Sequence, residues 1–584
     1  MAEVEALQRV TGWTWDTREL ASFLASPRQS SLAHSRWRKA LASAMAESSG
    51  LTEAETTRSV DLVTARIREI IRILDADPLL SGPRLVTDFD EASKPTASRD
   101  VLERINLADR TIESLGSIAY DRPEELVSPD LSEALARVLG RLASVICLSE
   151  QPDCGSCSIS RLCGSFREAS REAAWNSDQF TVVDLFCGAG GMSKGFEAAG
   201  FRIERALEID EVSARTFLLN HPQLSSSDLI VGDITDSNIK EKLVDELEGG
   251  RIDVLVGGPP CQGFSKVGKN AKRALRSRLG IVGFRPEDDD RNFLFEEFIE
   301  VAMRLRPRVA VMENVPGMDT ARKGGPSFMS IAASMLQSIG YSTAIWEIDA
   351  SSFGVPQRRV RKFLVAALGP VAPAMPVPDY RGQTRYSETA NDLLPPITLG
   401  QAISDLPPVG AGRGDEVTTA HYLADESERA LKHYVTAKSF PIRNFDRILV
   451  NHRARYNNSR DLELFSILEQ GENGYDAVFR YGRDDLMRYR KDAFHDKYYR
   501  LKLSEPSRTV VAHLKNDGNG YIHPDQVRSL TPREGARLQS FPDSYWFTGT
   551  QGDQWRQIGN AVPPLLAYHI AGAVRRHLKR MPAQ

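Results

Sequence analysis

Two different spacings of apolar residues divide the chain near residue 179. On the N-terminal side, apolar side chains recur at steps of three and four residues. The clearest set is Val60, Val63, Ile67, Ile70 and Leu74. This spacing is typical of helices that bury one face. We therefore predict a mostly helical region over residues 1–146.

From Gln179 onward, short apolar runs alternate with segments of helix length. The runs are FTVVDLF, RIERALEID, DLIVGDI, IDVLVGG, PRVAVMEN, STAIWEI and KFLVAAL. Their alternation with helices predicts a doubly wound, mostly parallel α/β sheet, which binds its ligand at the carboxyl ends of the strands. The proline-containing stretch DYRGQTRYSETANDLLPPITLG marks a boundary, so we place this domain at residues 178–370.

The overall composition is that of an ordinary globular protein, since 41% of the 584 residues are hydrophobic and 26% are charged. This excludes collagen-like, mucin-like and wholly disordered chains. The net charge is −4, so a nucleic-acid-binding function requires positive charge that is concentrated locally.

Residues 431–503 provide such a concentration. They contain fifteen Lys and Arg against ten Asp and Glu, together with twelve aromatic residues. Basic side chains interleaved with aromatic ones suit phosphate contact and base stacking. The alternative is a solvated basic surface over an aromatic core.

Membrane insertion and export are not expected. No stretch approaches 18 uninterrupted apolar residues, so we predict no membrane span. The start, MAEVEALQRV, is acidic and lacks the apolar run of an export signal. We therefore expect a cytoplasmic protein.

Four of the six cysteines fall within seventeen residues, in the spacing C-x6-C-x2-C-x5-C. They are Cys147, Cys154, Cys157 and Cys163. Four thiolates at short separations can converge on zinc or on an iron–sulfur cluster, whereas the alternative is four unrelated buried cysteines. The segment 147–163 resembles the 4Fe-4S loop of endonuclease-III-type DNA glycosylases, which implies a 4Fe-4S cluster with zinc as the alternative. No helix-hairpin-helix glycine signature precedes it, so no glycosylase activity is implied.

The segment VVDLFCGAGGMSKGF has the form of a strand, a tight glycine turn and the start of a helix. Glycines in such a turn let a ligand approach the backbone. Gly188 and Gly190 fit the dinucleotide-binding pattern G-x-G-x-x-G, but its third position is Ser193. We interpret the turn as a candidate site for a nucleotide-like ligand, and the missing glycine argues against a nicotinamide dehydrogenase.

Acidic residues end the next two predicted strands. Glu208 is placed to accept hydrogen bonds from ribose hydroxyls, as a carboxylate at the second strand end does in nucleotide-binding sheets. Asp233, after the third strand, could accept from an adenine amino group. The alternative for both is a helix N-cap.

The later strands end in reactive side chains. The fourth ends in GGPPCQGFS, where Cys261 suits covalent attack or, as the alternative, inert packing. The fifth ends at Glu313, whose carboxyl group can hydrogen-bond or protonate a ring nitrogen. Arg359 and Arg361, in QRRVR, face the same side by strand parity, either as donors over a bound base or as a surface edge.

Six motifs occur in an informative order: DLFCGAGG, GGPPCQGFS, ENV, QRRVR, RSLTPREGARLQSFPDSY and QIGNAVPP. Together they resemble the motif series of DNA cytosine-5 methyltransferases, from about residue 180 to 578. The resemblance implies an S-adenosylmethionine-dependent methyltransferase fold for a catalytic domain at 178–370. It also implies a target-recognition domain at 371–525 and a C-terminal segment, 526–584, that returns to the catalytic domain.

The same resemblance implies roles for individual residues. The S-adenosylmethionine pocket would be formed by Phe186, Gly188, Gly190, Glu208, Asp233, Pro259 and Asn560. The Cys261 thiolate would add to carbon 6 of a flipped cytosine while Glu313 binds N3 of the ring. Arg361 would contact the base, supported by Arg359. Carbon 5 would then take the methyl group, and loss of its proton would release the thiolate.

Three further segments carry predictions. Residues 266–278 hold six basic and no acidic side chains, which predicts a loop that closes on the DNA backbone, with Gln262 and Ser265 nearest the vacated base. The alternative is a solvated insertion. Thr509 and Val510 match a Thr-aliphatic pair that closes the family's recognition domain. The N-terminal 170 residues, which the family core lacks, would position the enzyme on DNA or bind a partner.

We therefore predict a bacterial, monomeric DNA cytosine-5 methyltransferase that acts on double-stranded DNA, with a cognate restriction endonuclease as a partner. The alternative is a tRNA cytosine-5 methyltransferase, which shares ENV and the thiol chemistry. CQGFS and the large recognition segment favour DNA. A non-catalytic DNA-binding module is a third interpretation, disfavoured because Cys261, Glu313 and Arg361 are all present.

Overall fold

The computed structural model describes most of the chain after residue 178, together with residues 170 and 173. The described ranges are 179–247, 249–260, 294–320, 326–382, 392–414, 417–419, 422–423, 440–443, 448–488 and 497–581. The predicted helical region 1–146, the four-cysteine segment 147–163, Cys261 and the basic loop 266–278 lie outside the described residues. What the sequence predicts for them therefore stays a prediction.

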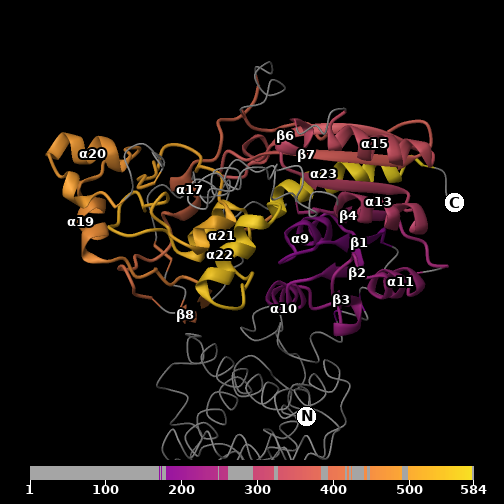
Figure 1. Ribbon diagram of the computed structural model, residues 1–584, viewed down its shortest axis with the longest axis horizontal. Coiled ribbons are helices and arrows are strands. Elements are labelled where there is room, and N and C mark those ends of the chain that lie inside the picture. The colour runs from indigo at the N-terminus through magenta and orange to yellow at the C-terminus, as the bar shows by residue number, and fades with distance from the viewer. Residues whose placement is uncertain are drawn as a thin grey trace, which may run out of the picture.

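Seven strands form one sheet in the order β3-β2-β1-β4-β5-β7-β6 (Figure 1). They are β1 (Thr181–Leu185), β2 (Arg202–Glu208), β3 (Leu229–Val231), β4 (Val254–Gly257), β5 (Val309–Asn314), β6 (Tyr341–Asp349) and β7 (Val360–Leu368). The first five pair in parallel, and β7 runs antiparallel between β5 and β6. Every predicted apolar run overlaps one of these strands, so the doubly wound, mostly parallel sheet is confirmed.

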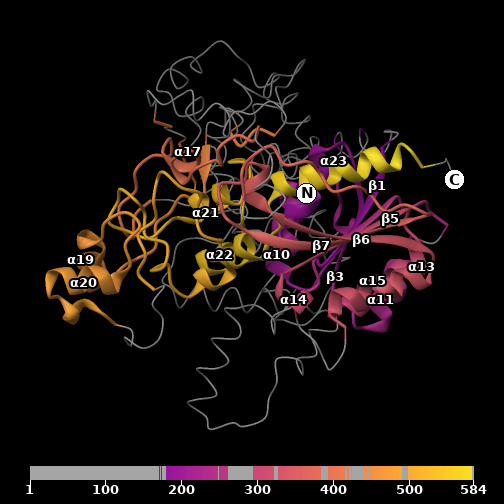
Figure 2. The same cartoon turned by 90° about the horizontal axis from the view of Figure 1, so that it is seen from above.

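Helices cover both faces of the sheet. They include α9 (Gly191–Ala198), α10 (Glu211–Asn220), α11 (Ser237–Asp245), α13 (Leu294–Leu305), α15 (Phe328–Ser338) and α23 (Pro564–Leu578). Val182 and Val254 enter a core with α9 and α23, whereas Val183 and Leu255 enter a second core with α13 and α15. Figure 2 shows α23 on one side of the sheet and α11, α13 and α15 on the other. Burial on both faces explains why the strands are continuous apolar runs.

The C-terminal helix α23 packs along α9, which follows the first strand. The approach is close at Gly195, where a Cβ would lie 2.4 Å from the Cβ of Ala567 and 2.5 Å from the carbonyl oxygen of Pro564. Any side chain at Gly195 would therefore force the two helices apart. None of the described helices is both long and apolar enough to span a membrane.

A second region lies on the left of the molecule in Figure 1. Its elements include α17 (Leu399–Ile403), β8 (Val417–Thr419), β9 (Ile448–Val450), α19 (Ser459–Ile467) and α20 (Gly474–Tyr481). Helices α19 and α20 share a small apolar core of their own, to which Leu464, Phe465 and Val478 contribute. This core joins the helices to Tyr498 and Ile522, later in the chain.

The charges within this region are segregated rather than interleaved. Residues 459–486, which include α19 and α20, carry three basic side chains against seven acidic ones. The excess of positive charge predicted for 431–503 therefore comes from the residues on either side of these two helices. An acidic pair of helices is a poor partner for phosphates, so we expect phosphate contact from the basic flanks rather than from these two helices, and the predicted DNA-contacting role of the stretch stays a prediction.

Helix α21 (Pro532–Leu538) lies between the two regions, and all of its residues are buried. The sequence TPRE, residues 531–534, begins this helix and forms a capping box. In this box Glu534 accepts a 2.7 Å hydrogen bond from the backbone N–H of Thr531. Arg533 donates to the carbonyl of Val450 in β9 (2.9 Å), and the carbonyl of Leu538 accepts from Gln357, near the sheet (2.8 Å). The helix therefore ties the second region to the sheet.

Candidate active site

Gly188 and Gly190, in the turn between β1 and α9, have different surroundings. Gly188 has a φ of 55°, and a Cβ built there would meet no atom within 4 Å among the described residues. Gly190 has a φ of 87°, but its Cβ would lie 2.4 Å from the ring of His221 and 2.7 Å from the hydroxyl of Tyr545. Gly188 thus leaves space beside the backbone, whereas Gly190 permits close packing of protein on protein. Phe186 also has a positive φ, 57°.

Glu208 holds the glycine turn in place from the end of β2. Its two carboxylate oxygens accept backbone hydrogen bonds from Gly188 and from Asp210, each of 2.8 Å. Burial raises the pKa of this carboxyl group, and the two backbone donors partly oppose the shift. The N-cap of α10 is Asp210 rather than Glu208, so the N-cap alternative for Glu208 does not apply. Each carboxylate oxygen retains a further lone pair that can accept a hydrogen bond.

Asp233 follows β3 and is exposed. Its Oδ1 accepts hydrogen bonds from the backbone N–H of Thr235 (2.9 Å) and from the hydroxyl of Thr235 (2.8 Å). Its Oδ2 makes no hydrogen bond with the described residues. The N-cap of the next helix, α11, is Asp236. Asp233 is thus fixed in a local turn with one oxygen directed to solvent or to a ligand.

Sequence analysis missed a buried pair beneath the glycine turn. The Ser193 hydroxyl, at the position where the dinucleotide pattern has its third glycine, donates a 2.6 Å hydrogen bond to Asp184. Both side chains are buried, and burial raises the pKa of Asp184 to about 7. The available signal was an acidic residue inside the apolar run VVDLF. Ser193, which replaces the third glycine of the pattern, is therefore hydrogen-bonded to a residue of β1.

Glu313 and Arg361 meet at the ends of β5 and β7. The Nε of Arg361 lies 2.9 Å from Oε1 of Glu313, and the two side chains are 14% and 13% exposed. A Cβ on Gly258 would lie 3.3 Å from Oε2 of Glu313, so the segment after β4 passes directly beside this carboxylate. Asn314 donates to the carbonyl of Pro259 (3.2 Å), which fixes that segment two residues before Cys261. Cys261 itself lies outside the described residues.

Arg359 and Arg361 make different hydrogen bonds at the start of β7, which begins at Val360. The buried guanidinium of Arg359 donates to the carbonyl oxygens of Val510 (2.8 Å), Gly559 (3.2 Å) and Ala561 (2.9 Å). The charges of Arg361 and Glu313 also act on the pKa of Arg359, so Arg359 lies near this pair. Arg359 therefore joins the sheet to two later segments.

The residues around Thr509 and Val510 run along the same junction. The Thr509 hydroxyl donates to the carbonyl of Arg358 (2.6 Å), and the backbone N–H of Val510 donates to the side chain of Gln357 (3.0 Å). These contacts bring the predicted closing pair of the recognition domain against QRRVR. The motif QRRVR thus lies at the junction of the two regions.

The segment that contains Asn560 reaches the glycine turn from the far end of the chain. Asn560 ends α22 (Gln551–Asn560) and is exposed. Immediately after it, the carbonyl oxygen of Val562 would lie 2.3 Å from a Cβ on Gly191, the first residue of α9. The chain therefore places Asn560 close to the start of α9.

A metal site is not found in the described part of the chain, where no three His, Cys, Asp or Glu side chains are arranged to hold an ion. The four cysteines predicted to bind a cluster lie outside the described residues. The fifth and sixth cysteines are Cys261 and Cys187, and burial raises the pKa of the Cys187 thiol.

These features define the class of protein. A doubly wound sheet with a glycine turn after β1, acidic side chains after β2 and β3, and a carboxylate–arginine pair at the ends of β5 and β7 is typical of α/β enzymes that bind a nucleotide-like ligand at the strand ends. The family follows from comparison with known proteins. Residues 180–576 match the model of the C-5 cytosine-specific DNA methylases, and the chain belongs to this family. It is a DNA (cytosine-5-)-methyltransferase, and S-adenosylmethionine is the cofactor of the family.

Individual relatives agree with this assignment. The chain is 30% identical over 443 residues to the type II methyltransferase M.AgeI of Thalassovita gelatinovora, which covers 68% of this chain and 99% of the relative. It is 31% identical over 398 residues to the type II methyltransferase M1.HphI of Haemophilus parahaemolyticus, covering 68% and 86%. A crystal structure of a candidate DNA modification methyltransferase from an E. coli prophage aligns with a TM-score of 0.50 at 24% identity, covering 69% of this chain and all of that one, and it shows the shared fold.

Proposed function

We propose that the carboxyl ends of β4, β5 and β7 form the catalytic centre for methylation of carbon 5 of cytosine in duplex DNA. The observation that carries this proposal is the contact between Glu313 and Arg361 beside the segment that leads through Pro259 to Cys261. A carboxyl group that is buried on one side and accessible on the other can act on a bound ring, whereas a fully enclosed one cannot.

The residues at the first strand ends fit S-adenosylmethionine. Gly188 offers open space for close approach, and Glu208 retains lone pairs beside it that suit ribose hydroxyls. Asp233 has one oxygen available for the adenine amino group. Phe186 in the turn after β1, Pro259 after β4 and Asn560 at the end of α22 would complete this site. Gly190 would contribute through the shape of the turn, because its own surroundings are filled by His221 and Tyr545.

The chemistry assigned to this chain starts with the Cys261 thiolate, which adds to carbon 6 of the ring. Glu313 holds a proton or a hydrogen bond at N3, so the electron pair displaced from the double bond accumulates at carbon 5. S-adenosylmethionine supplies the methyl group that carbon 5 takes up. Loss of the proton from carbon 5 then restores the double bond and expels the thiolate. The base must leave the duplex first, which costs a few kcal/mol.

The two arginines have separate tasks in this scheme. Arg361 holds Glu313 in place and contacts the flipped base through its remaining N–H groups. Arg359 acts as a positioning residue, since its guanidinium donates to three carbonyl groups of the later segments through its two terminal nitrogens, while its buried Nε makes no hydrogen bond with the described residues. The catalytic domain would span 178–370, the target-recognition domain 371–525 and the returning segment 526–584.

The biological setting is also proposed. Because the curated relatives are named type II methyltransferases, we infer a bacterial, cytoplasmic enzyme that protects host DNA beside a cognate restriction endonuclease. The N-terminal 170 residues would position it on DNA through a domain that holds the 4Fe-4S cluster or zinc. Absorbance spectra and iron analysis of anaerobically purified protein test the cluster, and a colourless, zinc-loaded sample would exclude it.

Bisulfite sequencing of a plasmid from an expressing host tests the proposed function most fully, because it reports activity, target base and site together. We expect protected cytosines at one recurring sequence. Transfer of tritiated methyl groups to tRNA but not to duplex DNA would instead support the tRNA enzyme.

A further inference from the structure

A short 3-10 helix, η8 (Ala512–Lys515), begins two residues after Val510. The carbonyl of Val510 is held by Arg359, which is two residues from Arg361. Two residues of extended chain span at most about 7 Å, so η8 starts close to the junction that carries the catalytic arginines. Any side chain that η8 directs outward therefore lies at a fixed position relative to the target base.

The backbone of η8 is held rigidly from two sides. Arg455 donates to the carbonyl oxygens of Leu514 (2.8 Å) and Lys515 (3.3 Å). On the other side α22 packs so closely that a Cβ on Gly559 would lie 2.1 Å from the backbone nitrogen of Ala512. Leu514 is buried in the core of the region. A turn held in this way positions its outward side chains without further ordering on binding.

Three polar side chains of this turn are exposed: His513, Lys515 and Asn516. The amide nitrogen of Asn516 lies 3.2 Å from Nδ1 of His513. Because an amide NH2 can only donate, Nδ1 accepts, and the neutral ring carries its proton on Nε2. Burial and the nearby charges of Lys497 and Lys515 lower the pKa of His513, which favours this neutral form at pH 7. The ring therefore presents one N–H donor, next to the cation of Lys515.

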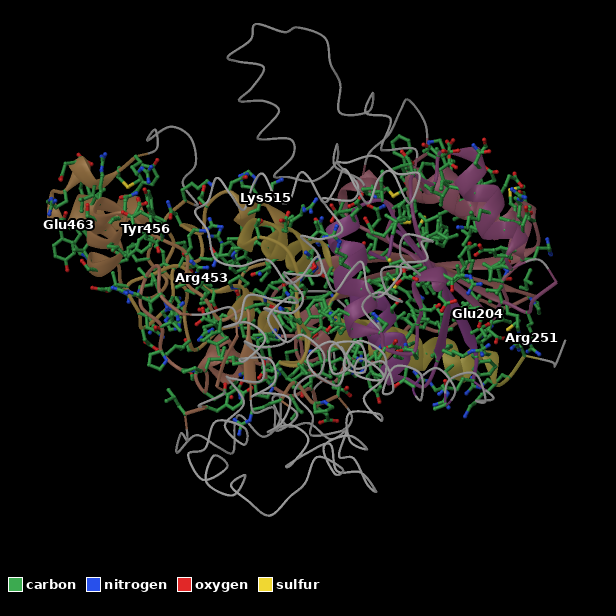
Figure 3. All side chains as sticks on the ribbon, turned by 90° about the horizontal axis from the view of Figure 1, so that it is seen from below. Glu204, Arg251, Arg453, Tyr456, Glu463 and Lys515 are labelled. Carbon is green, nitrogen blue, oxygen red and sulfur yellow. The ribbon has the colours of Figure 1, made fainter. Side chains whose placement is uncertain are left out.

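The charge of η8 contrasts with that of α19 and α20. Residues 459–486, which include those helices, carry an acidic excess, and acidic side chains engage two of the three arginines in this segment, Arg480 by Glu472 (2.8 Å) and Arg483 by Asp485 (2.9 Å). Lys515, by contrast, makes no ion pair with the described residues. In Figure 3 Lys515 lies near the middle of the molecule, with Arg453 and Tyr456 further toward the second region and Glu204 and Arg251 on the opposite side. Tyr456 is 78% exposed, which adds an aromatic surface to this basic group.

We propose that η8 reads a base edge next to the target cytosine, with His513 as a specificity-determining residue and Arg455 as the residue that positions the turn. This inference rests on the proposed methylation of duplex DNA. The Nε2–H of His513 suits an acceptor on a base edge in the major groove, namely N7 or O6 of guanine, N7 of adenine or O4 of thymine. Lys515 suits a neighbouring phosphate, which carries no sequence information.

The test compares site preference rather than activity alone. Full-length protein and three variants, His513→Ala, Arg455→Lys and Lys515→Gln, methylate a library of duplexes with randomised sequence around a cytosine, and the methylated sites are sequenced. The matched control is His577→Ala, because His577 is a half-buried histidine in the last turn of α23 and far from η8 along the chain. Melting temperature and binding of S-adenosylmethionine are measured for each variant.

We expect His513→Ala to lower the preference for one base position by about tenfold or more, the usual effect of losing one specific base contact. Arg455→Lys keeps the charge but not the two-carbonyl contact, so it should relax the same position. Lys515→Gln should weaken DNA binding uniformly and reduce its salt dependence without changing the site. His577→Ala should leave the preference unchanged.

The outcomes separate this inference from the proposed function. If the unmutated protein methylates no cytosine in the library, the proposed function fails. If the unmutated protein and His513→Ala methylate the same sites with the same preference, the role of His513 is overturned while the methyltransferase assignment stands. A uniform loss of activity with unchanged preference in both His513→Ala and Arg455→Lys also overturns it.

Discussion

Two regions of the molecule pair arginines with carboxylates, and they do so in opposite environments. At the strand ends, Glu313 and Arg361 form one 2.9 Å contact and keep part of their surface accessible. Around α21, Arg528 binds both oxygens of Glu534 (2.8 and 2.6 Å) with only 1% of either side chain exposed. Both pairs lie in motifs of the methyltransferase series. The accessible pair has donor and acceptor capacity left for a substrate, whereas the enclosed pair has none.

The pair of Arg528 and Glu534 belongs to a larger set of buried charged side chains around α21 that bind one another. Arg537 donates to Asp543 (2.8 and 2.6 Å) and also binds Asp405 and the carbonyl of Ala402 (2.9 Å). Although burial alone raises the pKa of Glu534, the guanidinium of Arg528 holds it well below its usual range. Such a set stabilises one arrangement of the two regions and contributes nothing directly to the chemistry.

The largest expected effect is on activity, from Glu313→Gln. The amide cannot supply a proton to N3, so the rate of methyl transfer should fall by about a hundred- to ten-thousandfold. Single-turnover methylation of duplex DNA measures this. Glu347→Gln is the matched control, because Glu347 also pairs with a cation on β7, Lys362 (2.9 Å), but is half exposed. Equal rates in the two variants would show that Glu313 has no role in the reaction.

Glu534→Gln should act on stability instead. It leaves the buried Arg528 without a counter-charge, which typically costs about 3–5 kcal/mol in the free energy of unfolding. Denaturant unfolding followed by the fluorescence of the buried Trp555 can measure the loss. Protein that remains folded at low temperature should still methylate DNA, since no step uses Glu534. A loss of methylation activity without a loss of stability would contradict the proposal that the pair at Glu534 has only a structural role.

The sequence predicted the sheet well because its strands are buried on both faces and therefore read as apolar runs. It also placed Glu208, Asp233 and Glu313 at strand ends, since a strand end is a local feature. It could not predict the hydrogen-bond partners of Arg359, because Val510 and Ala561 lie far along the chain.

Two further features were missed for different reasons. The Asp184–Ser193 contact arises only when α9 packs back on β1. The acidic excess of residues 459–486 can be read from the sequence, but it was hidden because charge was summed over residues 431–503.

A smaller effect, and one that depends on pH, is expected from Asp184→Asn. The pKa of Asp184 in the fold is about 7, against 3.8 for the ordinary carboxyl group, so the folded state binds the extra proton between these values. The contribution of this group to stability therefore falls as pH rises from about 4 to 7. The melting temperature of Asp184→Asn relative to the unmutated protein should rise between pH 5 and pH 8. A difference that is constant across this range would contradict the raised pKa.

The smallest effect is expected from an ion pair on the surface of the second region. Arg483 and Glu463 lie 2.6 Å apart, but their side chains are 38% and 50% exposed. Exposed pairs of this kind contribute little, because water and salt screen them. Glu463→Gln should leave both the melting temperature and the methylation rate unchanged within error. A marked loss in either would mean that the contribution of an ion pair depends on the distance between its charged atoms rather than on its burial.

The central claim is that the sulfur atom of Cys261 bonds to carbon 6 of the cytosine ring. The most direct measurement uses a duplex in which the target cytosine carries fluorine at carbon 5, so that the final proton loss is blocked. With S-adenosylmethionine present, the unmutated protein should give a protein–DNA adduct that survives denaturing electrophoresis, and Cys261→Ser should give none. Absence of the adduct with the unmutated protein, or an undiminished adduct with Cys261→Ser, would contradict the account.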